Sequence, residues 1–159
     1  MRMNSSHETK LHLLFRMKGE IYQEADLNIC LKNLKLQETD LVITSNSQMK
    51  KIKETNALGK AVLLNMDAYG TKEPKEEWVD DILKVANAYP YERIIAIGGG
   101  TVIDVSKLCV FGDDRSVQEL YSDKREVRKT RELIALPTTC GTGSEVTNVS
   151  VVEFPSLHS

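Results

Sequence analysis

Two polar loops in this sequence carry the groups that could bind a ligand, and each loop directly follows a short apolar run. Three consecutive glycines, Gly98, Gly99 and Gly100, come after residues 93–97 (RIIAI). The second loop, residues 137–148 (PTTCGTGSEVTN), comes after residues 133–136 (LIAL). Hydroxyl groups and unobstructed backbone amides at the end of a buried strand are where α/β proteins bind ligands. This placement predicts a nucleotide site.

The glycine loop suits a phosphate group. Glycine permits positive φ, and it lets backbone amides approach a ligand without a Cβ in the way. The amides of Gly99, Gly100 and Thr101 would lie at the positive end of a helix dipole, which favours anions. A second interpretation is a tight turn in which Thr101 is the N-cap and Asp104 closes a capping box; both interpretations can hold together. For Asp104 and Lys107 a solvent-facing ion pair is also expected.

The elements that must position these loops alternate along the chain. Apolar runs and helical periodicity predict strands at 10–17, 40–44, 60–66, 93–97 and 133–136, and helices at 22–34, 45–58, 76–88, 101–111 and 116–129. One face of the 76–88 helix is expected to carry Trp78, Ile82, Val85 and Ala86. Residues 145–152 return to strand-like alternation. This order predicts an α/β fold with a parallel sheet and flanking helices.

Length and composition fit one globular domain. The chain has 159 residues, of which 41% are hydrophobic, and a net charge of −2. Residues 1–9 are polar and are expected to be disordered, leaving residues 10–159 as the domain. The charge balance argues against nucleic-acid or anionic-membrane partners, and the locally basic residues 124–131 are expected to be a solvated helix face. The sequence has neither an apolar run near about twenty residues nor an apolar signal core, so a cytoplasmic location is expected.

Cysteine and histidine give no metal site in this chain. Cys30, Cys109 and Cys140 are odd in number and widely spaced, unlike a disulfide framework or a zinc site. Cys30 and Cys109 lie in apolar helical patterns and are expected to be buried, reduced thiols. Cys140 lies in the second polar loop and is the more accessible candidate for reaction. The three histidines are dispersed and lack ligand spacing.

The two loops resemble a known family. IGGGTVIDVSK (residues 97–107) and LPTTCGTGSEVTN (residues 136–148) are similar to the two nucleotide-binding signatures of the iron-containing (group III) alcohol dehydrogenases. Within the family, they most resemble 4-hydroxybutyrate dehydrogenases. The resemblance implies a Rossmann-like dinucleotide-binding domain of the iron-containing alcohol dehydrogenase/dehydroquinate synthase-like fold. It covers only the N-terminal half of such an enzyme, so the C-terminal helical metal domain is expected to be absent from this chain.

The resemblance also assigns residues of the glycine loop. Gly98, Gly99, Gly100 and Thr101 would wrap the pyrophosphate of NAD or NADP. Asp104 would lie beside the nicotinamide half of the coenzyme.

Residues of the second loop receive roles by the same resemblance. Thr138 and Thr139 would contact the adenosine portion, and Thr142 would face the phosphates or the nicotinamide ribose. Ser144 is a candidate for the same region, and Val151 would line the pocket with its side chain. An alternative for the threonines is ST-turn hydrogen bonding within the loop.

Two positions depart from the family pattern. Members commonly place Asp after the strand that here spans residues 41–44, where it receives the ribose hydroxyls, but this chain has Ser45. Because a carboxylate there would repel a 2′-phosphate, its loss leaves NAD and NADP both open. Glu73 precedes Pro74 where many members have Asn.

The family's metal ligands are not in this sequence. The resemblance implies a divalent ion, iron or zinc, held by one Asp and three His on the C-terminal domain, where it polarises the substrate oxygen. The intact enzyme is expected to oxidise 4-hydroxybutyrate to succinate semialdehyde, with no catalytic side chain supplied by this chain. The isolated chain is therefore expected to be inactive and to expose an apolar docking face, which allows a homo-oligomer. A non-catalytic nucleotide-binding module is the alternative.

Overall fold

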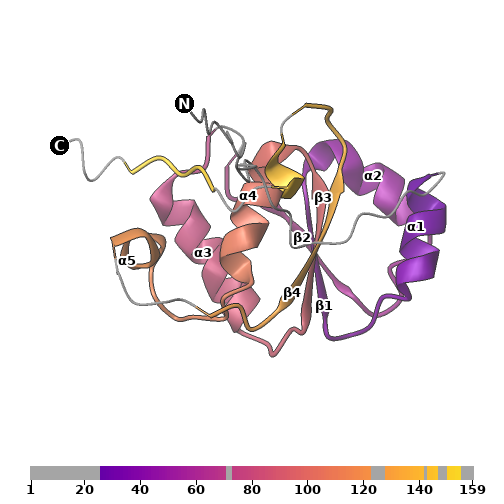
Figure 1. Cartoon of the computed structure of the whole chain (residues 1–159). Helices are drawn as coiled ribbons and strands as arrows, with labels where there is room; N and C mark the ends of the chain where they lie inside the picture. Colours follow the sequence, from indigo (N-terminus) through magenta and orange to yellow (C-terminus); the bar gives the residue numbers. More distant parts are fainter. Residues whose placement is uncertain (1–25, 71–72, 123–127, 142, 147–149, 155–159) are drawn as a thin grey trace, which may run out of the picture.

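A computed structural model describes residues 26–70, 73–122, 128–141, 143–146 and 150–154 (Figure 1). The helices are α1 (Leu27–Leu34), α2 (Asn46–Glu54), α3 (Glu76–Asn87), α4 (Gly100–Cys109) and α5 (Val117–Ser122), with short 3₁₀ turns η1 (Met66–Ala68) and η2 (Ser144–Val146). The strands are β1 (Asp40–Thr44), β2 (Val62–Asn65), β3 (Arg93–Gly98) and β4 (Glu132–Pro137). The expected strand at 10–17 and the expected disordered residues 1–9 lie outside the described residues.

The four strands form one parallel sheet in the order β2-β1-β3-β4. The two inner strands are apolar on both faces, and all of β1 and all of β3 after Arg93 is buried. Continuous burial of this kind is typical of a parallel strand covered by helices on both sides. The parallel α/β sheet expected from the sequence is therefore confirmed.

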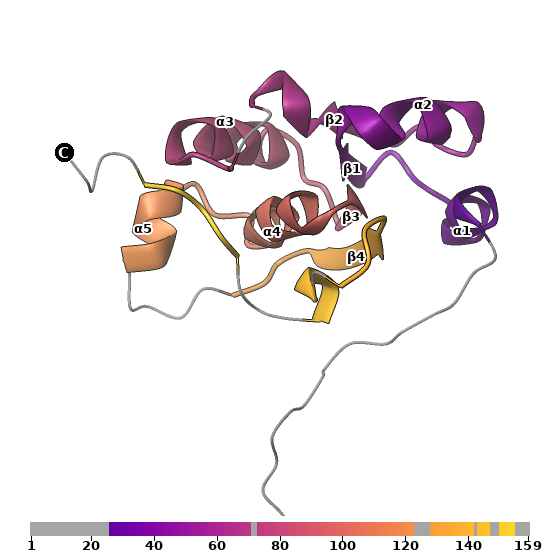
Figure 2. The ribbon, with the colours of Figure 1, turned by 90° about the horizontal axis from the view of Figure 1, so that it is seen from above.

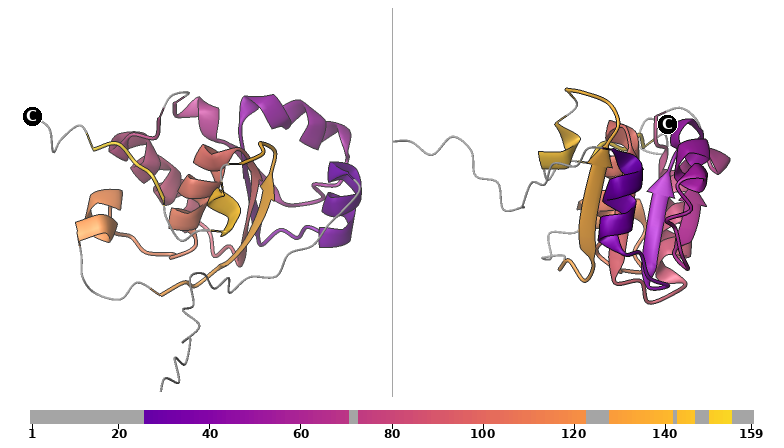
Figure 3. Two further views of the ribbon diagram at one scale, coloured as in Figure 1. Left: turned by 45° about the horizontal axis from the view of Figure 1, so that its top comes forward. Right: turned by 90° about the vertical axis from the view of Figure 1, so that its right-hand side faces the viewer.

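Helices cover both faces of the sheet. Viewed from above, α3, α4 and α5 lie on one side of the strands and α1 and α2 on the other (Figure 2); two further views show the same layers with the strands side by side (Figure 3). On the α3–α4 side, Ile82 and Ile103 pack with Ile94 and other buried residues. On the α1–α2 side, Leu31 and Ile52 pack with Ile95.

The amino ends of the strands are closed by ionic and polar contacts. Arg93 donates from Nε to Oδ1 of the fully buried Asp40 at 2.7 Å and also reaches the carbonyl of Leu34. Hydrogen bonding to Asp40 raises the pKa of Arg93 above its ordinary value. Arg131 donates to Oδ1 of Asn87 at 2.9 Å and to the carbonyl of Cys109 at 2.7 Å. These contacts tie β1, β3 and β4 to the surrounding helices at one edge of the sheet.

The structure corrects the expected core face of α3. Its buried residues are Val79, Ile82, Leu83 and Ala86, whereas Val85 is 36% exposed. Of the residues expected on one apolar face, Ile82 and Ala86 are buried and Trp78 packs against the core, but Val85 is exposed; Val79 and Leu83 complete the buried face.

Two expected elements near the end of the chain also differ. The helix at 116–129 is shorter, because α5 ends at Ser122 and residues 128–131 are not helical. The strand expected at 145–152 is wrong in its described part: residues 144–146 form a 3₁₀ turn, and Glu153 makes a single isolated bridge with Lys75. Polar side chains and two positive-φ glycines before this segment favour turns over a ladder.

The cysteines divide by exposure. Cys109 is buried, as expected, and Cys140 is exposed. Cys30 is only partly buried, which corrects the expectation for that residue. It lies on α1, whose outward face carries the exposed Ile29 and whose buried contact with the sheet is made by Leu31.

Candidate functional site

The two polar loops lie at the carboxyl edge of the sheet. β1 pairs with β2 on one side and with β3 on the other, so the strand order reverses direction between β1 and β3. In open parallel sheets, ligands bind outside the carboxyl ends of the strands at such a switch point. Ser45 follows β1 there, and the glycine loop follows β3.

The glycine loop is shaped by close packing. β3 ends at Gly98, Gly99 is the N-cap with φ −79° and ψ −173°, and α4 begins at Gly100. A Cβ on Gly98 would lie 2.5 Å from Cγ2 of Val102, so only glycine lets α4 approach the strand this closely. The expected positive φ is wrong for these three residues, since the positive-φ glycines of the described chain lie elsewhere.

The capping box proposed for α4 is wrong. The N-cap is Gly99, which has no side chain, and Thr101 lies inside the helix and is exposed. Asp104 does not reach back to the cap because its Oδ1 accepts from Nζ of Lys107 at 3.0 Å. The first amides of α4 lack intrahelical partners by helix geometry, and among the described residues no side chain is seen to cap them. They are therefore available to an anion.

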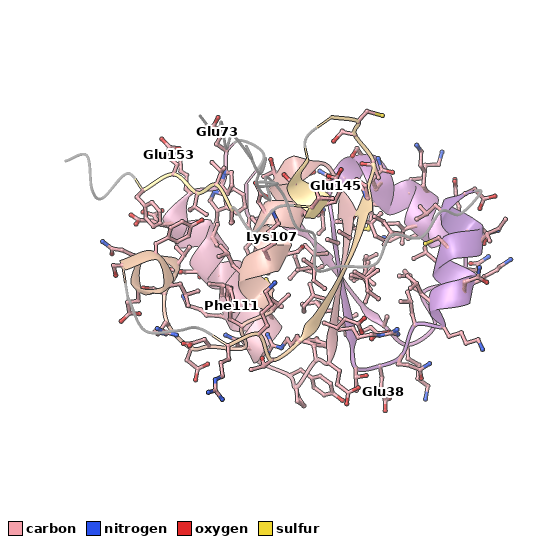
Figure 4. All side chains as sticks on the ribbon, in the orientation of Figure 1. Glu38, Glu73, Lys107, Phe111, Glu145 and Glu153 are labelled. Atoms are coloured by element: carbon pink, nitrogen blue, oxygen red, sulfur yellow. The ribbon has the colours of Figure 1, made fainter. Side chains whose placement is uncertain are left out.

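The Asp104–Lys107 pair exists but does not face solvent. Their side chains are 12% and 11% exposed respectively, which corrects the expected solvent-facing pair. Ser150 covers it from the later segment, donating its hydroxyl to the carbonyl of Asp104 at 2.8 Å. Figure 4 shows Lys107 on α4 and Glu145 on η2, two elements that contact each other. The pair thus lies beneath the second loop.

The structure brings the second loop onto the first. The amide of Thr138 donates to the carbonyl of Gly98 at 2.9 Å. A Cβ on Gly99 would lie 3.2 Å from Oγ1 of Thr139, so this hydroxyl lies beside the partly buried turn of the glycine loop. Thr138 and Thr139 are both exposed. The two motifs, far apart in sequence, therefore form one surface.

The remaining candidates are less closely joined to that surface. Ser144 begins the η2 turn, which packs on α4, and is partly buried. Val151 is 59% exposed. Thr142 lies outside the described residues. The roles given to these three residues stay predictions.

Sequence reasoning missed a polar cluster on the neighbouring strand ends. Oδ2 of Asp67, in η1, accepts from the amide of Asn46 at 2.7 Å, and Nδ2 of Asn65 donates to Oδ1 of Asn46 at 2.8 Å. The amide of Asp67 donates to Oδ1 of Asn65 at 3.2 Å. An Asp placed two residues after a strand was the available signal. Nothing in the spacing between residues 46 and 67 indicated that the two ends meet.

This surface offers binding groups rather than a reactive side chain. Its amides and hydroxyls can hold a phosphate, and α4 directs its positive end toward them. Burial raises the pKa of the Cys109 thiol to about 12, so that thiol is protonated and inert near neutral pH. Within the ranges that the structure describes, no group of three His, Cys, Asp or Glu residues could hold a metal ion. No described helix is long and apolar enough to cross a membrane.

A parallel sheet with a glycine loop and hydroxyl groups at its switch point defines a dinucleotide-binding protein of the Rossmann-like class. Comparison with known proteins narrows that class. The profile of the family "Iron-containing alcohol dehydrogenase" matches residues 21–158. The chain therefore belongs to the iron-containing alcohol dehydrogenase family.

Individual relatives agree with this assignment. The 4-hydroxybutyrate dehydrogenase of Clostridium kluyveri is 36% identical over 146 residues, which are 92% of this chain and 39% of that protein. An iron-containing alcohol dehydrogenase from Thermococcus thioreducens superposes with a TM-score of 0.69 at 27% identity, over 89% of this chain and 41% of the other. The sulfoacetaldehyde reductase of Bifidobacterium kashiwanohense, solved in complex with NAD⁺, superposes with a TM-score of 0.67 at 26% identity, over 82% of this chain and 36% of the other.

The chain spans about two fifths of the length of the Clostridium relative. The described residues fit a nicotinamide dinucleotide, because the uncapped amides of α4 and the Gly99 turn form a cradle that a Cβ would narrow. They do not fit the family's metal, for which the described part of the chain assembles no ligand set.

Proposed function

We propose that this chain is the NAD(P)-binding part of an alcohol dehydrogenase. The observation that supports the proposal is the contact between the glycine loop and the second loop. There the Thr139 hydroxyl lies next to Gly99, at the start of α4, where the N-cap has no side-chain hydrogen bond. Backbone amides there would bind the diphosphate, and the Thr139 hydroxyl would add a hydrogen bond beside it. A bound coenzyme would supply the hydride acceptor for oxidation of an alcohol to an aldehyde, with the hydroxyl proton released to solvent.

The residues of this chain bind and orient the coenzyme. The close approach of α4, allowed by Gly98, directs the helix dipole at the diphosphate. The buried Asp104–Lys107 pair and the hydrogen bond from Ser150 would keep the second loop on α4. Asp104 itself is proposed to lie near the nicotinamide half, with Thr138 nearer the adenosine.

Coenzyme binding can be tested on this chain directly. We expect NADH and ADP-ribose to bind without added metal, measured by titration calorimetry. Thr139→Val removes the hydroxyl and keeps the shape of the side chain. Because one hydrogen bond is lost, affinity should fall by about fivefold.

A matched control is Ser122→Ala, which removes an exposed hydroxyl on α5, away from both loops. It should leave the affinity unchanged. Failure of the unaltered chain to bind either nucleotide would refute the proposal.

The substrate of the whole enzyme is proposed to be 4-hydroxybutyrate, which would be oxidised to succinate semialdehyde. Similarity to the Clostridium enzyme over 92% of this chain supports this choice. A chimera tests it: this chain replaces the matching segment of that enzyme, and oxidation of 4-hydroxybutyrate is compared with that of simple primary alcohols. Activity with 4-hydroxybutyrate is expected. A chimera that binds NADH and oxidises only the simple alcohols would contradict it.

A further inference from the structure

The cluster at the carboxyl ends of β1 and β2 holds a fixed negative charge next to the proposed coenzyme site. Oδ2 of Asp67 is bonded to the amide of Asn46, and the amide of Asp67 is bonded to Asn65. Asn65 in turn donates to the Asn46 side chain. These three bonds fix the orientation of the carboxylate. Among the described residues, none donates a hydrogen bond to its second oxygen, Oδ1.

The cluster lies within reach of the glycine loop. Thr44, at the end of β1, is paired with Asn65 of β2 on one side and with Ile97 of β3 on the other. Neighbouring strands are about 4.8 Å apart, so the ends of β2 and β3 are roughly 10 Å apart. A diphosphate on the glycine loop would therefore place one attached ribose over the ends of β1 and β2.

Asp67 occupies the position that a second phosphate would need. The first amide of α2 belongs to Asn46, and Ser45, the N-cap, makes no side-chain cap hydrogen bond. Such an amide normally attracts an anion from a ligand. Here the chain's own carboxylate already accepts its hydrogen.

The first cation along α2 is a weak counterweight to this charge. Lys50 lies one turn further along α2 and pairs with Glu54 at 3.7 Å, with the Lys50 side chain 87% exposed. Its charge is therefore screened by solvent and shared with Glu54. A 2′-phosphate at the start of α2 would lie beside the carboxylate that already accepts the Asn46 amide.

We propose that Asp67 is the residue that selects the coenzyme, favouring a dinucleotide with a free ribose 2′-hydroxyl over one with a 2′-phosphate. Its open Oδ1 would accept a hydrogen bond from the ribose diol, and its charge would repel the phosphate. Asp67 would thereby supply the carboxylate that Ser45 lacks. This inference rests on the proposed coenzyme site.

The test compares NADH with NADPH on the same protein, with dissociation constants measured from nucleotide fluorescence. The unaltered chain should bind NADPH more weakly than NADH by about tenfold or more, as repulsion between neighbouring charges predicts. Asp67→Asn keeps an oxygen for the Asn46 amide but removes the charge. The gap, meaning the ratio of the NADPH dissociation constant to that of NADH, should therefore shrink to about twofold. Asp81→Asn, which removes one charge from an exposed pair on α3, is the matched control and should leave the gap unchanged.

A second measurement needs no variant. Because salt screens charge repulsion, raising the NaCl concentration should narrow the gap for the unaltered chain. A gap insensitive to salt, equal binding of both coenzymes, or an unchanged gap in Asp67→Asn would each overturn the inference and leave the proposed function standing. Failure of both coenzymes to bind would overturn the proposed function and this inference together.

Discussion

The edge of the sheet formed by the amino ends of the strands and the edge formed by their carboxyl ends differ in how their polar groups are bonded. At the amino edge, Arg93 and Asp40 pair, and Arg131 donates to carbonyl and amide oxygens of the surrounding segments. At the carboxyl edge, α4 begins at glycines with no side-chain cap, and Thr139 is exposed beside them. The amino edge satisfies these polar groups internally, whereas at the carboxyl edge the first amides of α4 have no side-chain partner among the described residues.

This difference separates stability from binding. Open donors cost little where water can reach them, and they become useful only when a ligand replaces the water. The middle parts of β1 and β3 are buried and apolar. The polar contacts at one end of the strands are therefore independent of those at the other end. Substitutions at the amino edge should therefore lower the free energy of unfolding, and substitutions at the carboxyl edge should mainly lower affinity.

The largest expected effect is at the amino edge. Arg93→Ala leaves the fully buried carboxylate of Asp40 without its cationic partner, which should lower the free energy of unfolding by about 3 kcal/mol or more. Urea unfolding followed by the fluorescence of Trp78, the sole tryptophan, measures it. Lys84→Ala breaks an exposed pair that solvent screens, and it should lower the free energy of unfolding far less. Equal losses in the two variants would contradict the contrast between buried and exposed pairs.

A smaller effect, on both stability and NADH affinity, is expected at the glycine loop. Gly98→Ala places a Cβ 2.5 Å from Val102, which should cost about 1–3 kcal/mol of stability and also weaken NADH binding, because α4 must move away. Val102→Ala in the same chain should recover part of both losses. Gly99→Ala, whose Cβ meets only the Thr139 side chain at 3.2 Å, should lower affinity with little loss of stability. A loss of stability in Gly99→Ala with unchanged NADH affinity would contradict this contrast between the two glycines.

The smallest expected effect is on thiol labelling. Since burial raises the pKa of Cys109 to about 12, its thiol stays protonated at pH 8, and its reactive thiolate would form only at far higher pH. Cys140 is exposed in the second loop and should react first with iodoacetamide. ADP-ribose should slow that labelling several-fold, followed by mass spectrometry, with Cys140→Ser as the control. Labelling of Cys140 at a rate that ADP-ribose leaves unchanged would place the ligand elsewhere.

The inner strands could be predicted from the sequence because burial on both faces leaves an unbroken apolar run. The prediction for 40–44 coincides with β1, and that for 93–97 falls one residue short of β3, which continues through Gly98. The Gly98 carbonyl still pairs with the Thr138 amide, a contact that apolar periodicity cannot reveal.

The chemistry of the loops was harder to predict in detail. The T-x-x-D spacing of Thr101 and Asp104 predicted a capping box, but Gly99 is the N-cap. Asp104 instead pairs with Lys107, and both side chains are largely buried. The cluster around Asp67 depends on two strand ends meeting, which follows from strand order and not from local pattern. Composition and periodicity report on local preference, and these contacts are decided by tertiary structure.

The pairing of β1 with β3 has a consequence for how the chain is made. Asp40 and Arg93 are 53 positions apart, whereas the contact between Asn46 and Asp67 closes 21. Longer closures cost more entropy, so β1, α2 and β2 can assemble before β3 arrives. On the ribosome, the backbone N–H and C=O groups on one edge of β1 therefore stay unpaired until β3 has been synthesised. An unpaired strand edge of this kind is prone to aggregation during that interval.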